Sequence, residues 1–210
     1  MNQQLENLIK KAQDLYSEKY LMIAIPGFLS KKYISYCSMI EDLRLSLEYL
    51  DYMKRDNDSV IKSSLCYSLI ALYGKCFTDA SKGGYPKLEP GSIFKNQEDF
   101  KRTHEYLMEL RHTFIAHRGK TESEIGIAFM ILEKGKGNND VEIKFSQLKQ
   151  NGFSKQKLLE IDILIHFLIK YLEVKIQKMA QDIYNTMLDQ LNVKQLSLML
   201  MNGSNDRTKK

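Results

Sequence analysis

Apolar residues recur at intervals of three and four along most of the chain, which is the period of an amphipathic α-helix. This pattern predicts a first helix over residues 3–19, a second from a Ser30 cap to about Lys54, and a third from about Ser59 to Asp79. The second helix is expected to bury Ile34, Cys37, Ile40, Leu43, Leu47 and Leu50. The third is expected to bury Ile61, Leu65, Leu69, Leu72 and Cys76.

Glycine and proline then interrupt the helical pattern. Residues 80–95 contain Gly83-Gly84, Pro86 and Pro90-Gly91, and they predict a loop longer than typical connections. A fourth helix is expected from near Asn96 to Arg118-Gly119, where a glycine suits a C-terminal cap.

Two predicted strands, Ile125–Leu132 and Val141–Phe145, enclose Gly135–Asp140, whose residues favour a hairpin turn. The hairpin would therefore occupy about residues 125–146. A fifth helix is expected over residues 154–191. It is apolar on nearly all sides from Leu158 to Ile176, so neighbours must bury it, with a second subunit as one candidate.

These elements predict a mainly α-helical bundle with a small β-hairpin insertion. A chain of 210 residues is consistent with one domain, over residues 1–201, followed by a flexible polar tail at 202–210. A net charge of +5 permits an RNA or phosphate partner without demanding one. No signal peptide is recognisable and no apolar run is long enough to cross a bilayer, which favours a cytoplasmic protein with no membrane contact.

The residues that commonly hold metals lack metal-ligand spacing. Cys37, Cys66 and Cys76 are interpreted as free thiols in a reducing compartment. Glu105 and Glu109 lie one turn apart, as expected on a solvated helix face. His166 lies in an apolar run and is interpreted as a core or interface histidine with its hydrogen bonds satisfied. No metal or cofactor is therefore expected.

The side chains best suited to catalysis are clustered at the end of the fourth predicted helix. Three of the four histidines, His104, His112 and His117, fall within fourteen residues, together with Arg111. Arginine stabilises phosphate oxyanions, and histidine moves protons near neutral pH. On an ideal helical wheel His117 lies roughly 120° from Arg111, so a joint site needs a deviation at the helix end or a second copy of the helix. The bare spacing is a weak motif, and a histidine near a helix C-terminus also serves as a structural cap.

The segment Thr103–Arg118 resembles the signature of HEPN-domain proteins, in which an arginine and a polar residue precede a histidine by four to six positions. The Ala116-His117 ending and the position of His104 are similar to HEPN relatives of the AbiU2 type, linked to abortive infection. The segment Leu69–Phe77, followed by a basic glycine-rich loop, fits the same resemblance.

The resemblance implies a dimeric helical bundle and a metal-independent endoribonuclease acting in phage defence, a toxin–antitoxin pair or stress response. Arg111 and His117 would then be the catalytic pair, and His112 takes the polar position where asparagine or aspartate is more usual. An antitoxin or defence-system protein is the implied partner. Two other hypotheses stay open: a non-catalytic module that binds RNA, nucleotide or protein, and a purely structural helical protein.

Several further side chains are candidates for contact with RNA. His104, Arg118, Lys75 and Lys82 are predicted to bind substrate, and Lys87 adds to a basic rim near the long loop. A solvated lysine surface is the alternative interpretation.

Overall fold

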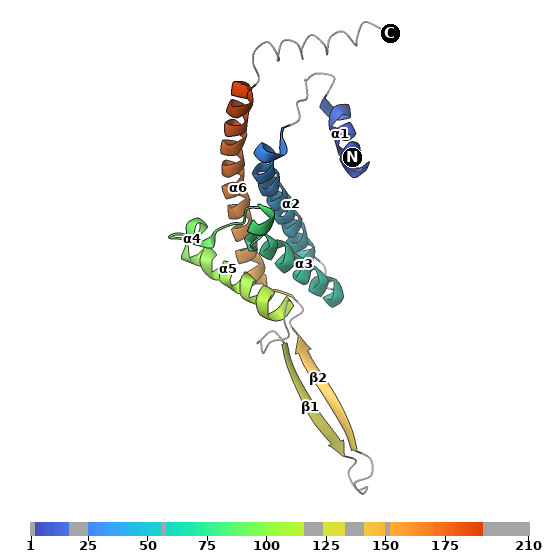
Figure 1. Cartoon of the computed structure of the whole chain (residues 1–210). Helices are drawn as coiled ribbons and strands as arrows, with labels where there is room; N and C mark the ends of the chain where they lie inside the picture. The colour runs from blue at the N-terminus through green and yellow to red at the C-terminus, as the bar shows by residue number, and fades with distance from the viewer. Residues whose placement is uncertain are drawn as a thin grey trace. The chain divides into compact units, whose positions relative to one another are not determined.

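The computed structural model describes residues 3–16, 25–55, 58–115, 124–132, 141–149 and 152–190. These residues form a mainly helical protein with one two-stranded antiparallel sheet, which confirms the predicted fold class (Figure 1). Where the sequence predicts a single domain, backbone contacts group the chain into two units. One comprises Met1–Ile34 with Lys175–Lys210, and the other comprises Ser35–Val174.

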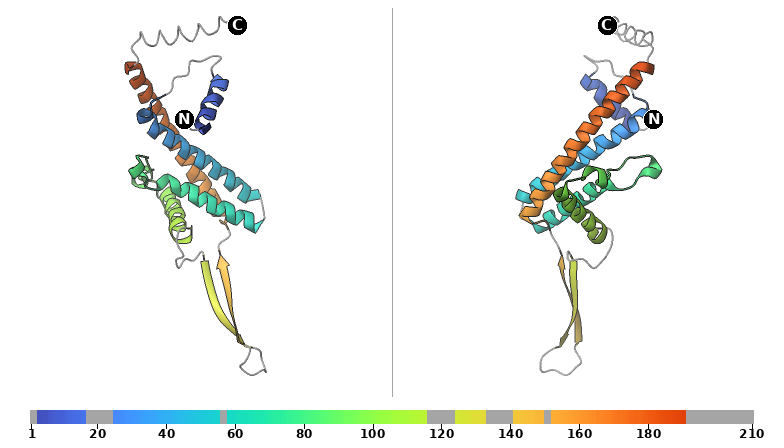
Figure 2. Two further views of the ribbon diagram at one scale, coloured as in Figure 1. Left: turned by 45° about the vertical axis from the view of Figure 1, so that its right-hand side comes forward. Right: turned by 90° about the vertical axis from the view of Figure 1, so that its left-hand side faces the viewer.

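The larger unit contains α3 (Ser59–Phe77) and the greater part of two longer helices, α2 (Gly27–Arg55) and α6 (Lys155–Gln190). Ion pairs link Lys54 to Asp162 and Arg44 to Glu173, so α2 and α6 run antiparallel within this unit (Figure 2). The side chains of the core come from all three helices: Leu43, Leu50, Leu69, Ile70, Tyr73, Ile161, Leu164, Ile165, Leu168 and Leu172.

The ends of these helices differ in part from the sequence prediction. Asp58 caps α3, because its carboxylate accepts hydrogen bonds from the backbone N–H groups of Val60 and Ile61 at 2.7 and 3.1 Å. The predicted Ser30 cap of α2 is wrong. That helix begins at Gly27, directly after Pro26, and the hydroxyl of Ser30 donates to the Pro26 carbonyl from inside the first turn.

Burial follows one face of each helix. Ile40, Leu43 and Leu50 of α2 are buried as predicted, whereas Ile34 and the α3 residue Ile61 are exposed near their helix ends. The prediction that α6 is buried on nearly all sides is wrong for this chain by itself. Within the predicted buried stretch, residues 158–176, the exposed large apolar side chains are Leu159, Ile163 and Val174.

The long loop after α3 is anchored to the core. It contains a short 3₁₀ turn, η1 (Ser81–Gly83), and a single helical turn, α4 (Pro90–Ile93). Between them the buried Leu88 donates its backbone N–H to the carbonyl of Cys76 at 2.9 Å. The chain then turns at Asn96, which has a φ of 63°, a left-handed conformation that asparagine tolerates.

The fourth predicted helix is divided into two kinds of helix. It runs as α5 (Glu98–Glu109) and continues as η2 (Leu110–Ile115), a π-helical segment with i→i+5 hydrogen bonds. The ring centroids of Phe100 and Phe167 lie 4.5 Å apart, so α5 packs on α6. Leu110 is buried. The side chain of Phe114 lies outside the described residues.

The predicted hairpin is present, with strands β1 (Glu124–Leu132) and β2 (Val141–Lys149). β2 is longer than predicted. Glu124 pairs with Lys149 and Leu132 with Val141, in antiparallel register. The expected turn at 135–140 lies outside the described residues, as does the tail at 202–210.

The smaller unit includes α1 (Gln3–Tyr16), whose apolar side chains Leu8, Ile9, Leu15 and Tyr16 are exposed. None of the helices in the described ranges combines the length and apolar character that a membrane crossing requires.

The cysteines are free thiols, as predicted. Cys66 and Cys76 are buried, and burial raises the pKa of each thiol to about 12.

Candidate functional site

The π-helical segment η2 carries two of the predicted catalytic residues. Leu110 is buried and anchors the segment, Arg111 is half-buried, and His112 is exposed. Thr113 donates its hydroxyl to the carbonyl of Glu109 at 2.7 Å. A joint site of Arg111 and His117 was expected to need either a deviation of the helix end from α geometry or a second copy of the helix, and η2 is such a deviation. Helical turns of the π type are frequent at functional sites.

Arg111 crosses α3 at a glycine. A Cβ atom added at Gly74 would lie 2.0 Å from Cδ of Arg111 and 2.6 Å from its Nε, far inside van der Waals contact. Only glycine leaves room for the arginine side chain in this position. Sequence reasoning missed this role of Gly74, although an isolated glycine inside a helical pattern is a recognisable signal of close packing.

The described residues place no acidic side chain against the guanidinium of Arg111. Among the described residues, no carboxylate forms an ion pair with it. A half-buried arginine without an acidic partner keeps its charge and its N–H donors available to an anionic ligand. A cation held against α3, with no counter-charge in the part of the chain that the structure describes, is the feature of the site most relevant to chemistry.

His104 precedes Arg111 by seven residues and is buried in an aromatic cluster. Its Nδ1 lies 2.8 Å from the hydroxyl of Tyr73, and its ring centroid lies 4.4 Å from that of Phe77 and 5.0 Å from that of Phe94. Burial lowers the pKa of His104 to about 4, so the ring is neutral at pH 7. With 6% of its surface exposed, His104 is placed to hold α5 on α3 rather than to contact RNA, contrary to the role predicted for it.

Tyr73, which forms the hydrogen bond with His104, directly precedes Gly74 in the chain. Tyr73 is fully buried, and burial raises its pKa well above the usual value, so the phenol stays protonated. The neutral pair satisfies two polar groups inside the core. It therefore fixes the position of α5 against α3 immediately beside the point where Arg111 crosses.

The basic side chains predicted to contact RNA differ in their ion pairs and in their distance from Arg111 along the chain. Lys75 follows Gly74 on α3, and its Nζ lies 2.8 Å from a carboxylate oxygen of Asp42. Lys87 forms a longer ion pair with Glu89, at 3.6 Å. Lys82 is exposed on η1. The structure thus brings Arg111 against Gly74, while the ammonium of Lys75 pairs with Asp42 on α2. His117 and Arg118 lie outside the described residues.

Two other predictions from the sequence concern residues away from Arg111. His166 is exposed rather than in the core. Its Nδ1 lies 2.9 Å from the backbone carbonyl of Asp162 and 2.8 Å from the carboxylate of the same residue, so this ring nitrogen has a hydrogen-bond partner. Glu105 and Glu109 are exposed, as predicted. Within the described ranges no group of three His, Cys, Asp or Glu side chains is arranged to hold a metal ion.

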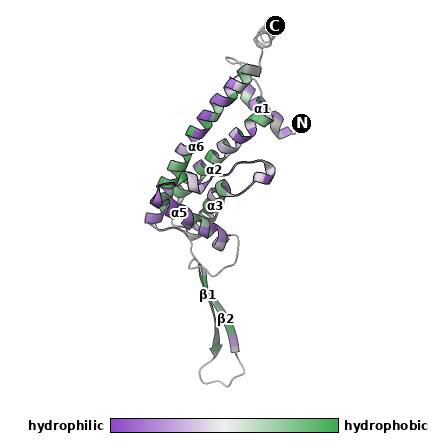
Figure 3. Cartoon of the chain, turned by 60° about the vertical axis from the view of Figure 1, so that its left-hand side comes forward, coloured by the Kyte–Doolittle hydropathy of each residue, from purple (hydrophilic) through white to green (hydrophobic). Residues whose placement is uncertain are grey.

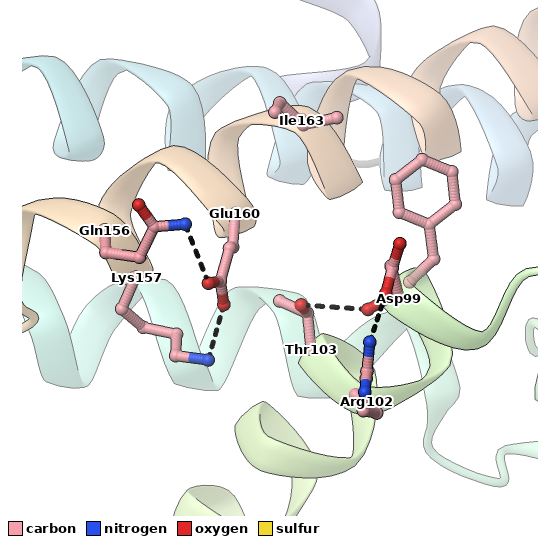
Figure 4. A pocket seen from close by; sticks show the side chains of 8 residues that line it. Asp99, Arg102, Thr103, Gln156, Lys157, Glu160 and Ile163 are labelled. Carbon is pink, nitrogen blue, oxygen red and sulfur yellow. Dashed lines mark hydrogen bonds and ion pairs between the residues drawn. The ribbon is translucent and has the colours of Figure 1, made fainter.

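A pocket of about 560 Å³ lies between α5 and α6, and sequence reasoning did not anticipate it. Figure 4 shows Lys157 and Gln156 directed at Glu160, and Arg102 directed at Asp99. Each cation in the pocket is thus matched by a carboxylate, which leaves little net charge for a polyanion. The lining residues are Asp99, Phe100, Arg102, Thr103, Gln156, Lys157, Glu160 and Ile163.

No protein-family model matches this chain, and comparisons with curated proteins and with solved structures found no similar protein.

Proposed function

We propose that the chain is a metal-independent endoribonuclease of the HEPN type, with Arg111 and His117 as its catalytic pair. The observation that carries the proposal is the placement of Arg111. Its side chain is packed against Gly74 and has no carboxylate partner among the described residues. A preorganised, uncompensated cation is what stabilisation of a phosphorane requires.

The proposed reaction is attack of a ribose 2′-hydroxyl on the adjacent phosphorus. His117 removes the 2′ proton, the new P–O bond forms, and Arg111 stabilises the charge on the phosphorane. The bond to the 5′-oxygen then breaks, and that oxygen takes a proton from the exposed His112 or from water. The products carry a 2′,3′-cyclic phosphate and a 5′-hydroxyl. Lys75, Lys82 and Arg118 contribute positive charge along the RNA backbone in this proposal.

The proposal includes a homodimer and a cytoplasmic role in phage defence, in a toxin–antitoxin pair or in stress response, with an antitoxin or defence-system protein as partner. A two-fold pairing of the η2 segments would place two arginines and two histidines around one groove. Mixing Arg111→Ala with His117→Ala under subunit exchange tests this arrangement. Partial recovery of cleavage is expected for a composite site, and proven exchange without recovery contradicts it.

The primary experiment is cleavage of single-stranded RNA by the purified protein in excess EDTA, with the product ends identified by mass spectrometry. Arg111→Ala and His117→Ala should each lower the rate by roughly 10²–10³-fold, the typical effect of losing one oxyanion donor. Arg102→Ala is the matched control, because this α5 arginine is exposed and paired with Asp99. Cleavage that survives both site substitutions, or that stops with chelator, contradicts the mechanism.

A second candidate function is a non-catalytic module that binds RNA or nucleotide through the same arginine. His112 favours it, since this histidine occupies the position after the arginine where the resembled signature usually has asparagine or aspartate. This function predicts RNA binding that weakens in Arg111→Ala and with rising salt, without any cleavage. Fluorescence anisotropy with labelled RNA measures the binding.

A further inference from the structure

The β-hairpin is exposed on both of its faces. Every described side chain in residues 125–131 and 142–148 is exposed, and Ile143 is 74% accessible. Paired residues of an antiparallel sheet share a face, so the register places apolar side chains on each side. Figure 3 shows the hydrophobic colour along both strands. One face carries Ile125, Ile127, Phe129, Ile131 and Leu148, and the other carries Ala128, Met130, Ile143 and Phe145.

A two-stranded hairpin of this kind is marginally stable by itself in water, and further strands or packing against a helix give independent stability. Within the described residues no other strand pairs with the outer edge of β1, so this edge is a template for another strand. An added strand on this edge would supply the support that two strands lack.

The two edges differ in charge. β1 contains no charged residue from Ile125 to Leu132. β2 carries Glu142, Lys144 and Lys149, with an ion pair of 3.1 Å between the first two. Charged side chains, lysine above all, are the means by which proteins protect an edge strand from pairing. β1 is consequently the edge that lacks this protection.

We propose that the β1 strands of two copies of this chain pair antiparallel about a two-fold axis at Ala128, forming a four-stranded sheet. In this register Ile125 lies opposite Ile131 of the other copy, and Ile127 lies opposite Phe129. Cross-strand pairs of β-branched and aromatic residues stabilise antiparallel sheets. The strand is self-complementary: over residues 125–131 the pairing places apolar residues opposite apolar residues and brings no charges together.

A second copy is favoured over an unrelated partner by this self-complementarity, because an isologous interface needs the same patch on both subunits. The overlap covers all nine residues of β1, a length of about 30 Å. The inference does not rest on the proposed ribonuclease activity, since Arg111 takes no part in the strand pairing.

Sedimentation equilibrium tests the interface with a matched pair of substitutions. Phe129→Lys introduces a charge on the β1 edge, and Phe145→Lys makes the same change on β2. We expect the first to weaken dimerisation at least tenfold and the second to change it less than twofold. A wild-type chain that is monomeric at micromolar concentration overturns the proposal, as does equal weakening by both substitutions.

A cross-linking experiment remains decisive if Phe129→Lys disturbs the hairpin itself. Ala128→Cys is made in a Cys37→Ser background, which leaves only the two buried native thiols. The proposed axis brings the two introduced Cβ atoms within about 4.5–5.5 Å, close enough for a disulfide after mild oxidation. Ser146→Cys on β2 is the control, because the outer strands of a four-stranded sheet lie about 14 Å apart.

The expected result is a covalent dimer from Ala128→Cys alone, and the same dimer when Arg111→Ala is added. Retention of the cross-link together with loss of RNA cleavage would separate this interface from the catalytic proposal. Absence of the cross-link at position 128, or equal cross-linking at 128 and 146, overturns the inference.

Discussion

Two regions of the larger unit differ in how they are stabilised. One is the contact of α3 with α5, which is held by buried side chains, and the other is the β-hairpin, whose side chains are exposed. At the helix contact, Tyr73 and Leu107 have no exposed surface, and the absence of a side chain at Gly74 leaves room for Arg111. In the hairpin, Ile143 and Leu148 are about three-quarters exposed, and strand pairing supplies the order. An apolar sequence thus forms a buried core in one region and an exposed apolar surface in the other.

The largest expected difference between the two regions is in the free energy of unfolding. Leu107→Ala should lower it by about 2–5 kcal/mol, because a buried leucine loses both transfer energy and packing. Ile143→Ala should change it by less than about 0.5 kcal/mol, since the side chain is exposed. Urea denaturation followed by circular dichroism measures both. Similar losses for the two variants would show that the hairpin side chain is buried in solution.

The helix contact should also lose stability on acidification. The pKa of His104 is about 4 in the folded protein, against 6.5 for an exposed histidine. Between these values the unfolded chain binds a proton at this position that the folded chain does not, so the free energy of unfolding falls as pH falls. This group contributes a slope of up to about 1.4 kcal/mol per pH unit, and nothing further below pH 4.

Denaturation at pH 6.5, 5.5 and 4.5 measures that slope. His104→Gln should flatten it, because glutamine does not titrate and its carbonyl still accepts from the hydroxyl of Tyr73. His166→Gln, at an exposed histidine, is the matched control. An unchanged slope in His104→Gln would place the acid-sensitive group elsewhere.

The close approach of Arg111 to Gly74 predicts a coupled pair of smaller effects. Alanine is preferred over glycine in a helix interior by about 1 kcal/mol, so Gly74→Ala should stabilise the Arg111→Ala variant by that amount. In the wild-type background the new Cβ displaces Arg111, and the gain should shrink or reverse. A double-mutant cycle in urea measures the difference. Gly91→Ala, where a Cβ would meet nothing within 4 Å, should show no coupling to Arg111.

The smallest expected effect concerns Lys75 and Asp42. Lys75 is 64% exposed, and exposed ion pairs contribute about 0–1 kcal/mol. Lys75→Met should therefore cost at most about that much, and the cost should diminish in high salt. Lys82→Met serves as the comparison, since no ion pair to Lys82 is present among the described residues. A loss above 2 kcal/mol would assign Lys75 a structural role that its exposure does not explain.

The hydrophobic pattern by itself determined the kind and order of the main elements. The spacing of Leu43, Leu50 and Leu69 predicted helix faces that are buried, and the two apolar runs around Gly135–Asp140 predicted the hairpin. Residue chemistry and spacing made Arg111 a candidate site residue and predicted free thiols at Cys66 and Cys76. These features depend on local periodicity and residue chemistry, which a single chain records directly.

Tertiary structure decided what each side chain meets. The role of Gly74, the burial of His104 against Tyr73, and the pairing of Lys75 with Asp42 join residues that are 31 to 37 positions apart. The π-helical turn at η2 likewise departs from the ideal wheel that the sequence pattern assumes. Periodicity specifies which face of an element is apolar, but packing between elements selects the partner and the depth of burial, because those energies arise only after distant segments meet.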